Sequence, residues 1–346
     1  MSKKSGCLVA LLVGALVVSI GLNVGLSMGK LGLSALDAGL LTGAQPRQRF
    51  SETLIERGKK PTQGKIVHLN LDGVISSMEM GGLFAGAMPS VDSLKQSLEQ
   101  AVKDKNVKAI VLRINSPGGE VTASDIIYNA VKKAAKEKPV VVYMDSMAAS
   151  GGYYVACGAT KIVASETTLT ASIGVIIETL NYSDLFGKVG LSVNTFTSGA
   201  FKDSLSGARP MRDDEKAYVQ NLVTQMYDRF LGIVSEARGV PKETLKSTVA
   251  DGRVVTGREA LAAKLVDQIG YVEDAYALAR ELGGDADASV VKYHREVSLF
   301  DAFSGAASAS AESAAHPAKV QLDVSSSMLP KLQPGVPYYL PASYAR

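Results

Sequence analysis

The chain has 346 residues, of which 46% are hydrophobic, and its formal net charge is +3 at pH 7. This length and apolar content can bury one large core with appendages. The near balance of charge, with no basic cluster or array of stacking aromatic residues, excludes a typical nucleic-acid-binding protein. Two cysteines and three widely separated histidines provide no disulfide framework, and neither a metal site nor a cofactor is expected.

The N-terminal region has the composition of a membrane anchor. Residues Ser5 to Gly29 carry no charge and are bracketed by lysines, and at about 1.5 Å per residue they can cross a hydrocarbon core of about 30 Å. A cleaved secretory signal is the alternative, but its apolar region is usually only about 7–15 residues long. We therefore expect a cytoplasmic stub and transmembrane anchor over residues 1–30, a linker over 31–61, and an exported domain after them.

From residue 65 onward, strand and helix patterns alternate. Short apolar runs predict strands, and apolar residues at helical spacing predict helices. The strands are expected at 65–71, 108–114, 139–144, 161–164 and 191–197, and the helices at 91–103, 121–136 and 213–237. This rhythm predicts an α/β domain, over residues 62–297, with a parallel sheet and functional loops at the carboxyl ends of its strands. Residues 298–346 form a tail rich in Ala and Ser near its start, which is expected to be disordered.

Two glycine-rich turns follow buried strands and should therefore meet at one edge of the sheet. They are Pro117-Gly118-Gly119 and Ser150-Gly151-Gly152. A serine on a tight strand-to-helix turn exposes its hydroxyl, and two facing glycine turns can direct two backbone N–H groups at one oxygen. The alternative for Ser150 is a helix-capping serine, which is common at such turns.

A serine nucleophile requires a base, and the sequence offers two kinds. None of the three histidines lies near the predicted catalytic edge: His68 is on an early strand, and His294 and His316 follow the core. Lysine is the remaining candidate, and Lys202 stands in the short apolar run SGAFK. A lysine base working near neutral pH must lose about 3 units from the reference pKa of about 10.4, within the range known for buried lysines. The neighbouring Asp203 could oppose that loss unless it points away.

Five motifs in order resemble those of the bacterial signal peptide peptidase A family, in its short, single-domain, membrane-anchored form. They are NSPGG at 115–119, MAASGGYY at 147–154, ASIG at 171–174, GAFK at 199–202 and RVVTG at 253–257. The resemblance covers about residues 65–284. It implies the Clp-protease/crotonase-like α/β superfold, with Ser150 as nucleophile and Lys202 as general base. By the same resemblance Ser172 orients the lysine, and Gly118 and Gly151 supply the oxyanion amides, with Gly119 as an alternative to Gly118.

The resemblance also implies a function. It predicts a serine endopeptidase in the bacterial inner membrane that degrades remnant signal peptides and other short apolar peptides, with its catalytic domain on the outer side. Apolar substrates would fit a groove lined by residues 78–88 and by Tyr153 and Tyr154. The family further implies a cyclic homo-oligomer whose neighbouring subunits share each site. Two alternatives are a crotonase-like acyl-CoA enzyme, which would not need Ser150 and Lys202, and a non-catalytic membrane scaffold.

Overall fold

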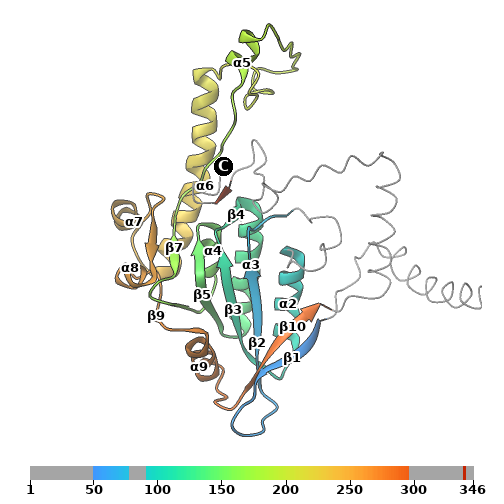
Figure 1. Ribbon diagram of the computed structural model, residues 1–346. Coiled ribbons are helices and arrows are strands. Elements are labelled where there is room, and N and C mark those ends of the chain that lie inside the picture. The colour runs from blue at the N-terminus through green and yellow to red at the C-terminus, as the bar shows by residue number, and fades with distance from the viewer. Residues whose placement is uncertain (1–49, 78–90, 296–337, 340–346) are drawn as a thin grey trace, which may run out of the picture. The chain divides into compact units, whose positions relative to one another are not determined.

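The computed structural model describes residues 50–77, 91–295 and 338–339 (Figure 1). The predicted anchor at Ser5 to Gly29, the groove segment at 78–88 and most of the predicted tail lie outside these residues. Among the described helices, none combines the length and apolar character needed to cross a bilayer.

The centre of the fold is a mostly parallel sheet in the order β1-β10-β2-β3-β5-β6-β9. Its inner strands β2, β3 and β5 pair in parallel register, with Leu112 between Leu69 and Val142. Strands with both faces covered read as continuous apolar runs, which explains the composition of β3 and of the first half of β5. The strands of this path are β1 (Phe50–Glu56), β2 (Lys65–Asp72), β3 (Val107–Ser116), β5 (Val140–Ala149), β6 (Lys161–Ala164), β9 (Gln268–Ile269) and β10 (Ser289–Arg295).

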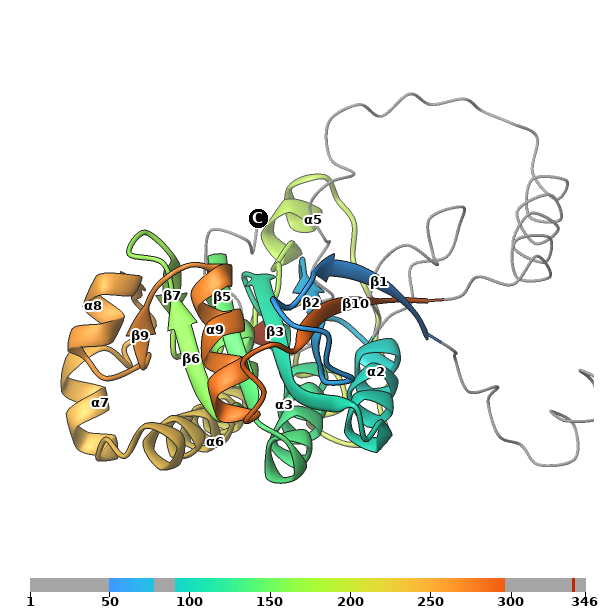
Figure 2. The same ribbon diagram turned by 90° about the horizontal axis from the view of Figure 1, so that it is seen from below.

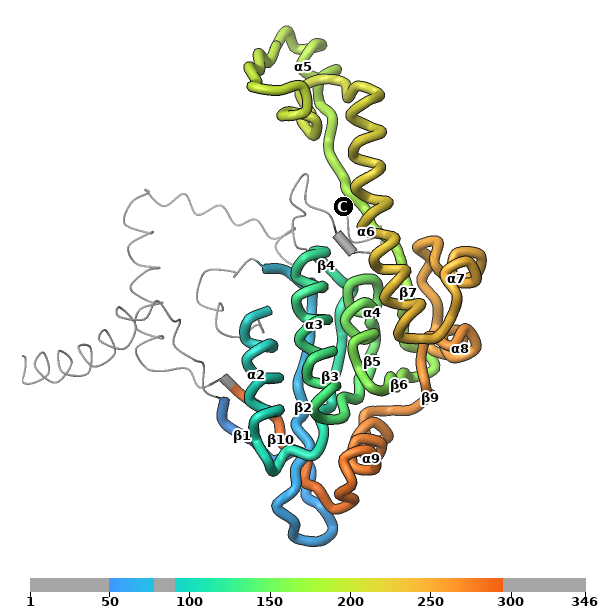
Figure 3. The backbone as a smooth tube through the Cα atoms, turned by 180° about the vertical axis from the view of Figure 1, so that it is seen from behind, coloured from blue at the N-terminus to red at the C-terminus, as the bar shows by residue number. Residues whose placement is uncertain are grey.

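Helices cover both faces of the sheet (Figures 2 and 3). On one face lie α2 (Val91–Lys103), α3 (Val121–Glu137) and α4 (Gly151–Ala156), whose apolar side chains share one core cluster with the sheet. On the other face, α9 (Val272–Leu282) buries Ala275, Tyr276 and Ala279 against a second cluster. The predicted α/β fold with a parallel sheet and flanking helices is confirmed by this arrangement.

A small antiparallel unit follows the carboxyl edge of β5. Strand β7 (Leu169–Ala171) pairs in parallel with the end of β5 and antiparallel with β8 (Val254–Thr256). Helices α7 (Lys242–Thr248) and α8 (Gly257–Ala262) lie beside this unit (Figure 1). Thr256 caps α8, because its hydroxyl accepts from the Glu259 amide while the Glu259 carboxylate accepts from the Thr256 amide.

Residues 176–226, which we call the arm, extend from the carboxyl edge of the sheet. The arm consists of an irregular stretch that includes α5 (Ser183–Lys188) and of the first half of α6 (Asp213–Arg238) (Figure 1). Only the second half of α6 is anchored in the core, through Phe230, Leu231 and Val234. The predicted strand at 191–197 is wrong: these residues form no strand and their side chains are exposed. Within the described part of the chain, no strand pairs with them to complete a ladder.

Two further segments differ from expectation. Residues 50–56 fall within the predicted linker, but they form β1, which pairs antiparallel with β10 at the edge of the sheet. The side chains of β1 are largely exposed, so its sequence lacks the apolar signal of the inner strands. In the predicted tail, Tyr338–Tyr339 form β11, which pairs antiparallel with β4 (Gly119–Glu120).

Candidate active site

Ser150 lies between the end of β5 and the start of α4, at the carboxyl edge of the sheet. Its backbone has φ 53° and ψ −114°, a conformation that non-glycine residues rarely adopt. A hydrogen bond of 2.7 Å from the Ser150 amide to the Ala171 carbonyl connects this turn to β7. This strained strand-to-helix turn is the geometry expected of a nucleophile elbow.

The hydroxyl of Ser150 does not cap α4. Ser150 occupies the N-cap position, yet its side chain makes no capping hydrogen bond, which removes the alternative of a helix-capping serine. The residue is only 1% exposed. A serine that is almost buried at a strained turn, with a side chain that makes no capping bond, is a candidate for a chemical role.

The glycine turn after β3 faces Ser150. Gly118 adopts φ 104°, which glycine tolerates at little cost, and its amide donates to the Ser116 hydroxyl at 3.1 Å. The next residue is bracketed by two bonds to Ile75, because the Gly118 carbonyl accepts from the Ile75 amide and the Glu120 amide donates to the Ile75 carbonyl. Since N–H directions alternate along an extended segment, the Gly119 amide points away from Ile75. The Gly119 nitrogen lies 3.1 Å from the place that a Cβ on residue 151 would take, so the two glycine turns are in close contact.

Ser172 reaches the same edge through β7. Ala171 and Ser172 both adopt positive φ, at 62° and 51°, and the Ser172 amide donates to the Arg253 carbonyl at 2.9 Å. The Ala171 carbonyl accepts the hydrogen bond from the Ser150 amide. Ser172 therefore directly follows the residue that supports the turn at Ser150. Three non-glycine residues in strained conformations therefore meet at this one place, as is common at functional sites.

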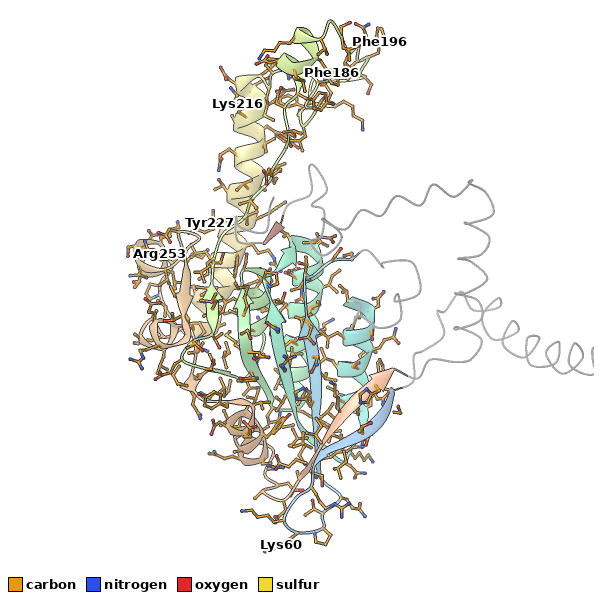
Figure 4. All side chains as sticks on the ribbon, viewed as in Figure 1. Lys60, Phe186, Phe196, Lys216, Tyr227 and Arg253 are labelled. Atoms are coloured by element: carbon orange, nitrogen blue, oxygen red, sulfur yellow. The ribbon has the colours of Figure 1, made fainter. Side chains whose placement is uncertain are left out.

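A pocket of about 460 Å³ adjoins Ser172. Its walls are residues 172–176, one side of α6 between Gln220 and Tyr227, and residues 250–252. Tyr227 and Arg253 mark its neighbourhood at the base of the arm (Figure 4). No single sequence motif indicates this pocket, because three distant segments build it.

The structure does not bring Lys202 to Ser150 within the chain. Lys202 belongs to the arm and is exposed, and among the described residues its side chain makes no hydrogen bond to Ser150 or to Ser172. Its neighbour Phe201 packs against Tyr218 on α6, with ring centroids 5.4 Å apart. Phe230, 12 residues further along α6, contacts Tyr154 of α4, so the lysine segment lies about 18 Å along the helix from that contact.

The structure also assigns roles to His68 and to two tyrosines that the sequence analysis named. His68 is structural: it is buried between Asn70 and Tyr276, and burial lowers its pKa to about 4. Tyr153 and Tyr154 do not line a groove, because both are fully buried. Their hydroxyls bond to the Leu265 carbonyl and to Asp125, so α4 uses these rings to attach the nucleophile turn to the core.

We expect Gly151→Ala to lower kcat by about 10²- to 10³-fold, the usual cost of losing one oxyanion donor. The added Cβ would lie 2.5 Å from the Ser124 hydroxyl and 3.1 Å from both Gly118 Cα and the Gly119 nitrogen, so the two glycine turns must separate. Hydrolysis of an apolar fluorogenic peptide measures the effect. Gly187→Ala is the control, since nothing lies within 4 Å of its added Cβ. Wild-type kcat in Gly151→Ala would contradict the role of this turn.

The chain is similar to known peptidases. The family profile of "Peptidase family S49" matches residues 132–284, and that of Clp protease matches residues 92–171. The chain is 37% identical over 252 residues to "Putative signal peptide peptidase SppA" of Enterococcus faecium, covering 72% of each protein. It is 36% identical over 226 residues to "Putative protease slr0021" of Synechocystis sp., covering 65% of this chain and 77% of that one.

A plant relative adds the reaction type. "Serine protease SPPA, chloroplastic" of Arabidopsis thaliana is 32% identical over 218 residues, which cover 63% of this chain and 32% of that protein. Identity of this level over most of the described domain, together with a matching family profile, goes beyond a shared fold. The chain therefore belongs to peptidase family S49 and is a serine peptidase with a Clp-protease/crotonase-like α/β fold.

Proposed function

We propose that this serine peptidase is a membrane-anchored endopeptidase that hydrolyses remnant signal peptides and other short apolar peptides with a Ser150/Lys202 dyad. The observation that carries the dyad proposal is the buried Ser150 on a strained turn, with a hydroxyl that makes no capping bond. Ser150 Oγ attacks the peptide carbonyl while Lys202 removes its proton and passes it to the leaving amine. Water, deprotonated by the same lysine, then releases the acyl group.

The oxyanion of the tetrahedral intermediate would be stabilised by two backbone amides. Gly151 supplies one of them, as the first residue of α4. Of the two candidates for the other, Gly118 donates to Ser116, and Gly119 pairs with Tyr339 of β11. A substrate would have to displace one of these partners, so both glycines stay candidates. Ser172, next to the support of the nucleophile turn, would accept or donate the hydrogen bond that orients the lysine amine.

We further propose that each dyad forms between neighbouring subunits of a cyclic homo-oligomer. Lys202 lies on the arm, and the arm projects beyond the sheet edge that carries Ser150 (Figures 1 and 4). The outer part of the arm exposes many apolar side chains, among them Leu180, Leu191 and Phe196, the last 96% exposed. Such a surface is typical of an interaction site, and a second subunit would cover it while receiving the lysine.

Two features support an apolar peptide substrate. The pocket beside Ser172 is lined by Ile173, Val175, Ile176 and Val223 among others, which suits an aliphatic side chain. In addition, β4 accepts an antiparallel strand, β11, directly beside Gly119, and strand addition is a common way to hold an extended peptide.

The uncharged segment Ser5–Gly29 supports a location in the bacterial inner membrane, with this domain on its outer side.

Labelling with a serine-reactive fluorophosphonate tests the dyad. We expect the full-length protein in detergent to be modified at Ser150, with a rate that rises with pH because only a neutral lysine can accept the serine proton. Lys202→Ala should lose this labelling. Modification at another serine would contradict the nucleophile assignment, and an unchanged rate in Lys202→Ala would contradict the base assignment. Cys157 will not compete, since burial raises the pKa of its thiol to about 12.

A further inference from the structure

The segment that carries Lys202 is held on α6 by one arginine that bridges two carboxylates. Residues 198–212 contain turns but neither helix nor strand. Arg209 donates to Asp203 through Nε and Nη2, at 2.9 and 2.8 Å, and to Glu215 through Nη1 and Nη2, at 2.9 and 2.6 Å. Planar guanidinium groups make such forked contacts and ammonium groups do not, so the position requires arginine.

Glu215 is the fixed end of this bridge. Its side chain is 0% exposed, whereas Arg209 is 32% and Asp203 18% exposed. The Arg212 amide also donates to Glu215, and hydrogen bonding from Arg209, followed by that from Arg212, lowers the pKa of Glu215 to about 2. A buried carboxylate that stays ionised requires a cation, and Glu215 has two, because Arg212 Nη1 also lies 2.9 Å from its Oε1. Of these two arginines, Arg209 is the one that also binds Asp203.

The residues on both sides of Lys202 make contacts with arginines, whereas the Lys202 side chain forms no ion pair with a described residue. The Ala200 carbonyl accepts from Arg212 at 3.0 Å, and the Arg212 guanidinium lies 5.7 Å from the centre of the Phe201 ring. Asp203 is bound to Arg209. Within the described residues, the Lys202 amine has no ion-pair partner, although a carboxylate follows it directly in the sequence.

The remaining carboxylates of α6 nearby are also occupied. Asp213 pairs with Lys216 at 2.9 Å, and Asp214 pairs with Arg212 at 3.0 Å. Every carboxylate between residues 203 and 215 therefore has a cationic partner other than Lys202. An unpaired carboxylate within about 4–6 Å would instead favour the charged form of the lysine, and a charged lysine cannot act as a base.

We propose that Arg209 is a positioning residue that holds the Asp203 carboxylate away from Lys202, so that this lysine can lose its proton and serve as the base. The inference rests on the proposed function, because it concerns the same lysine. Hydrogen bonding to Arg209 also lowers the pKa of Asp203, which keeps this pair ionised throughout the working range. The arm thus carries its own charge compensation, whichever subunit supplies the serine.

The test measures kcat/KM as a function of pH in a set of full-length variants. It compares the pH at which kcat/KM rises as Lys202 loses its proton, which we call the acid limb. In Arg209→Gln the released Asp203 favours charged Lys202, so the limb moves to higher pH by about one unit, and activity on the limb falls about tenfold. In Arg209→Gln/Asp203→Asn the limb returns to its wild-type position, although the contacts to Glu215 are still lost. In Asp203→Asn alone the limb stays where it is.

Arg238→Gln is the matched control. Arg238 makes two side-chain hydrogen bonds at the other end of α6, one to Asp267 and one to the Lys264 carbonyl. Its loss lowers thermal stability without moving the limb, so destabilisation alone is separated from the charge effect. An unshifted limb in Arg209→Gln, or a limb that stays shifted in the double variant, overturns the proposal.

The results for these variants distinguish a failure of this inference from a failure of the proposed function. If Arg209→Gln does not fold, the pH profile of Asp203→Asn still tests the proposal. A shift of its acid limb to lower pH would mean that Asp203 raises the pKa of Lys202 in the wild type and that Arg209 does not prevent this, which would contradict the proposal. If Lys202→Ala hydrolyses peptides as fast as the wild type, the dyad itself fails. If Lys202→Ala is inactive but the acid limb of kcat/KM does not shift as expected in the Arg209 variants, the dyad is supported and the proposed role of Arg209 is wrong.

Discussion

Replacing Ser150 with alanine or glycine abolishes peptide hydrolysis, with an expected loss of at least about 10⁴-fold in kcat, because the reaction loses its nucleophile. The two variants differ in stability. Ser150 adopts φ 53° and ψ −114°, and such a conformation costs a non-glycine residue about 1–3 kcal/mol. Alanine keeps the Cβ and the strain, whereas glycine removes both.

We therefore expect Ser150→Gly to unfold at a higher temperature than Ser150→Ala. Glycine adds about 0.5–1 kcal/mol of conformational entropy to the unfolded chain, which leaves a net gain of about 1 kcal/mol, or about 2–4 °C. Differential scanning calorimetry of the full-length protein in detergent measures it. Equal unfolding temperatures would show that the strain is no larger than the entropy cost of glycine, about 0.5–1 kcal/mol, and residual hydrolysis in either variant would remove Ser150 as the nucleophile.

Mixing two inactive proteins, Ser150→Ala and Lys202→Ala, restores activity if the dyad forms between subunits. In a ring whose interfaces all have the same direction, random exchange joins an intact serine to an intact lysine at about a quarter of the interfaces. The structural reason is the position of Lys202 on the arm, about 18 Å along α6 from the contact with the helix that follows Ser150.

A second mixture controls for exchange. When wild-type protein is mixed in equal amounts with the double variant Ser150→Ala/Lys202→Ala, about half of all sites in the mixture are active if each subunit builds its own dyad. About a quarter of all sites are active if the dyad is shared. Both mixtures are measured after subunit exchange has been verified with two fluorescent labels. An inactive first mixture together with a half-active second mixture would assign the dyad to a single subunit.

The sequence alone determined those parts of the protein that rest on local pattern. Apolar runs such as Lys108–Ile114 and Pro139–Met144 became β3 and the first part of β5, because a strand buried on both faces must be apolar throughout. The parallel order then places the turns at Gly118 and Ser150 on one edge. Family motifs directed attention to Lys202, which composition alone would not distinguish from a solvated lysine.

Features that depend on partners distant in the sequence could not be predicted from local pattern. Residues 50–56 form a strand because β10, more than 230 residues later, pairs with them. Residues 191–197 have a strand-like sequence, but none of the strands that the structure describes pairs with them. Tyr153 and Tyr154 are core residues, since α3, α6 and the loop at Leu265 enclose them. Asp203 faces Arg209 rather than Lys202, because the buried Glu215 on α6 fixes that arginine.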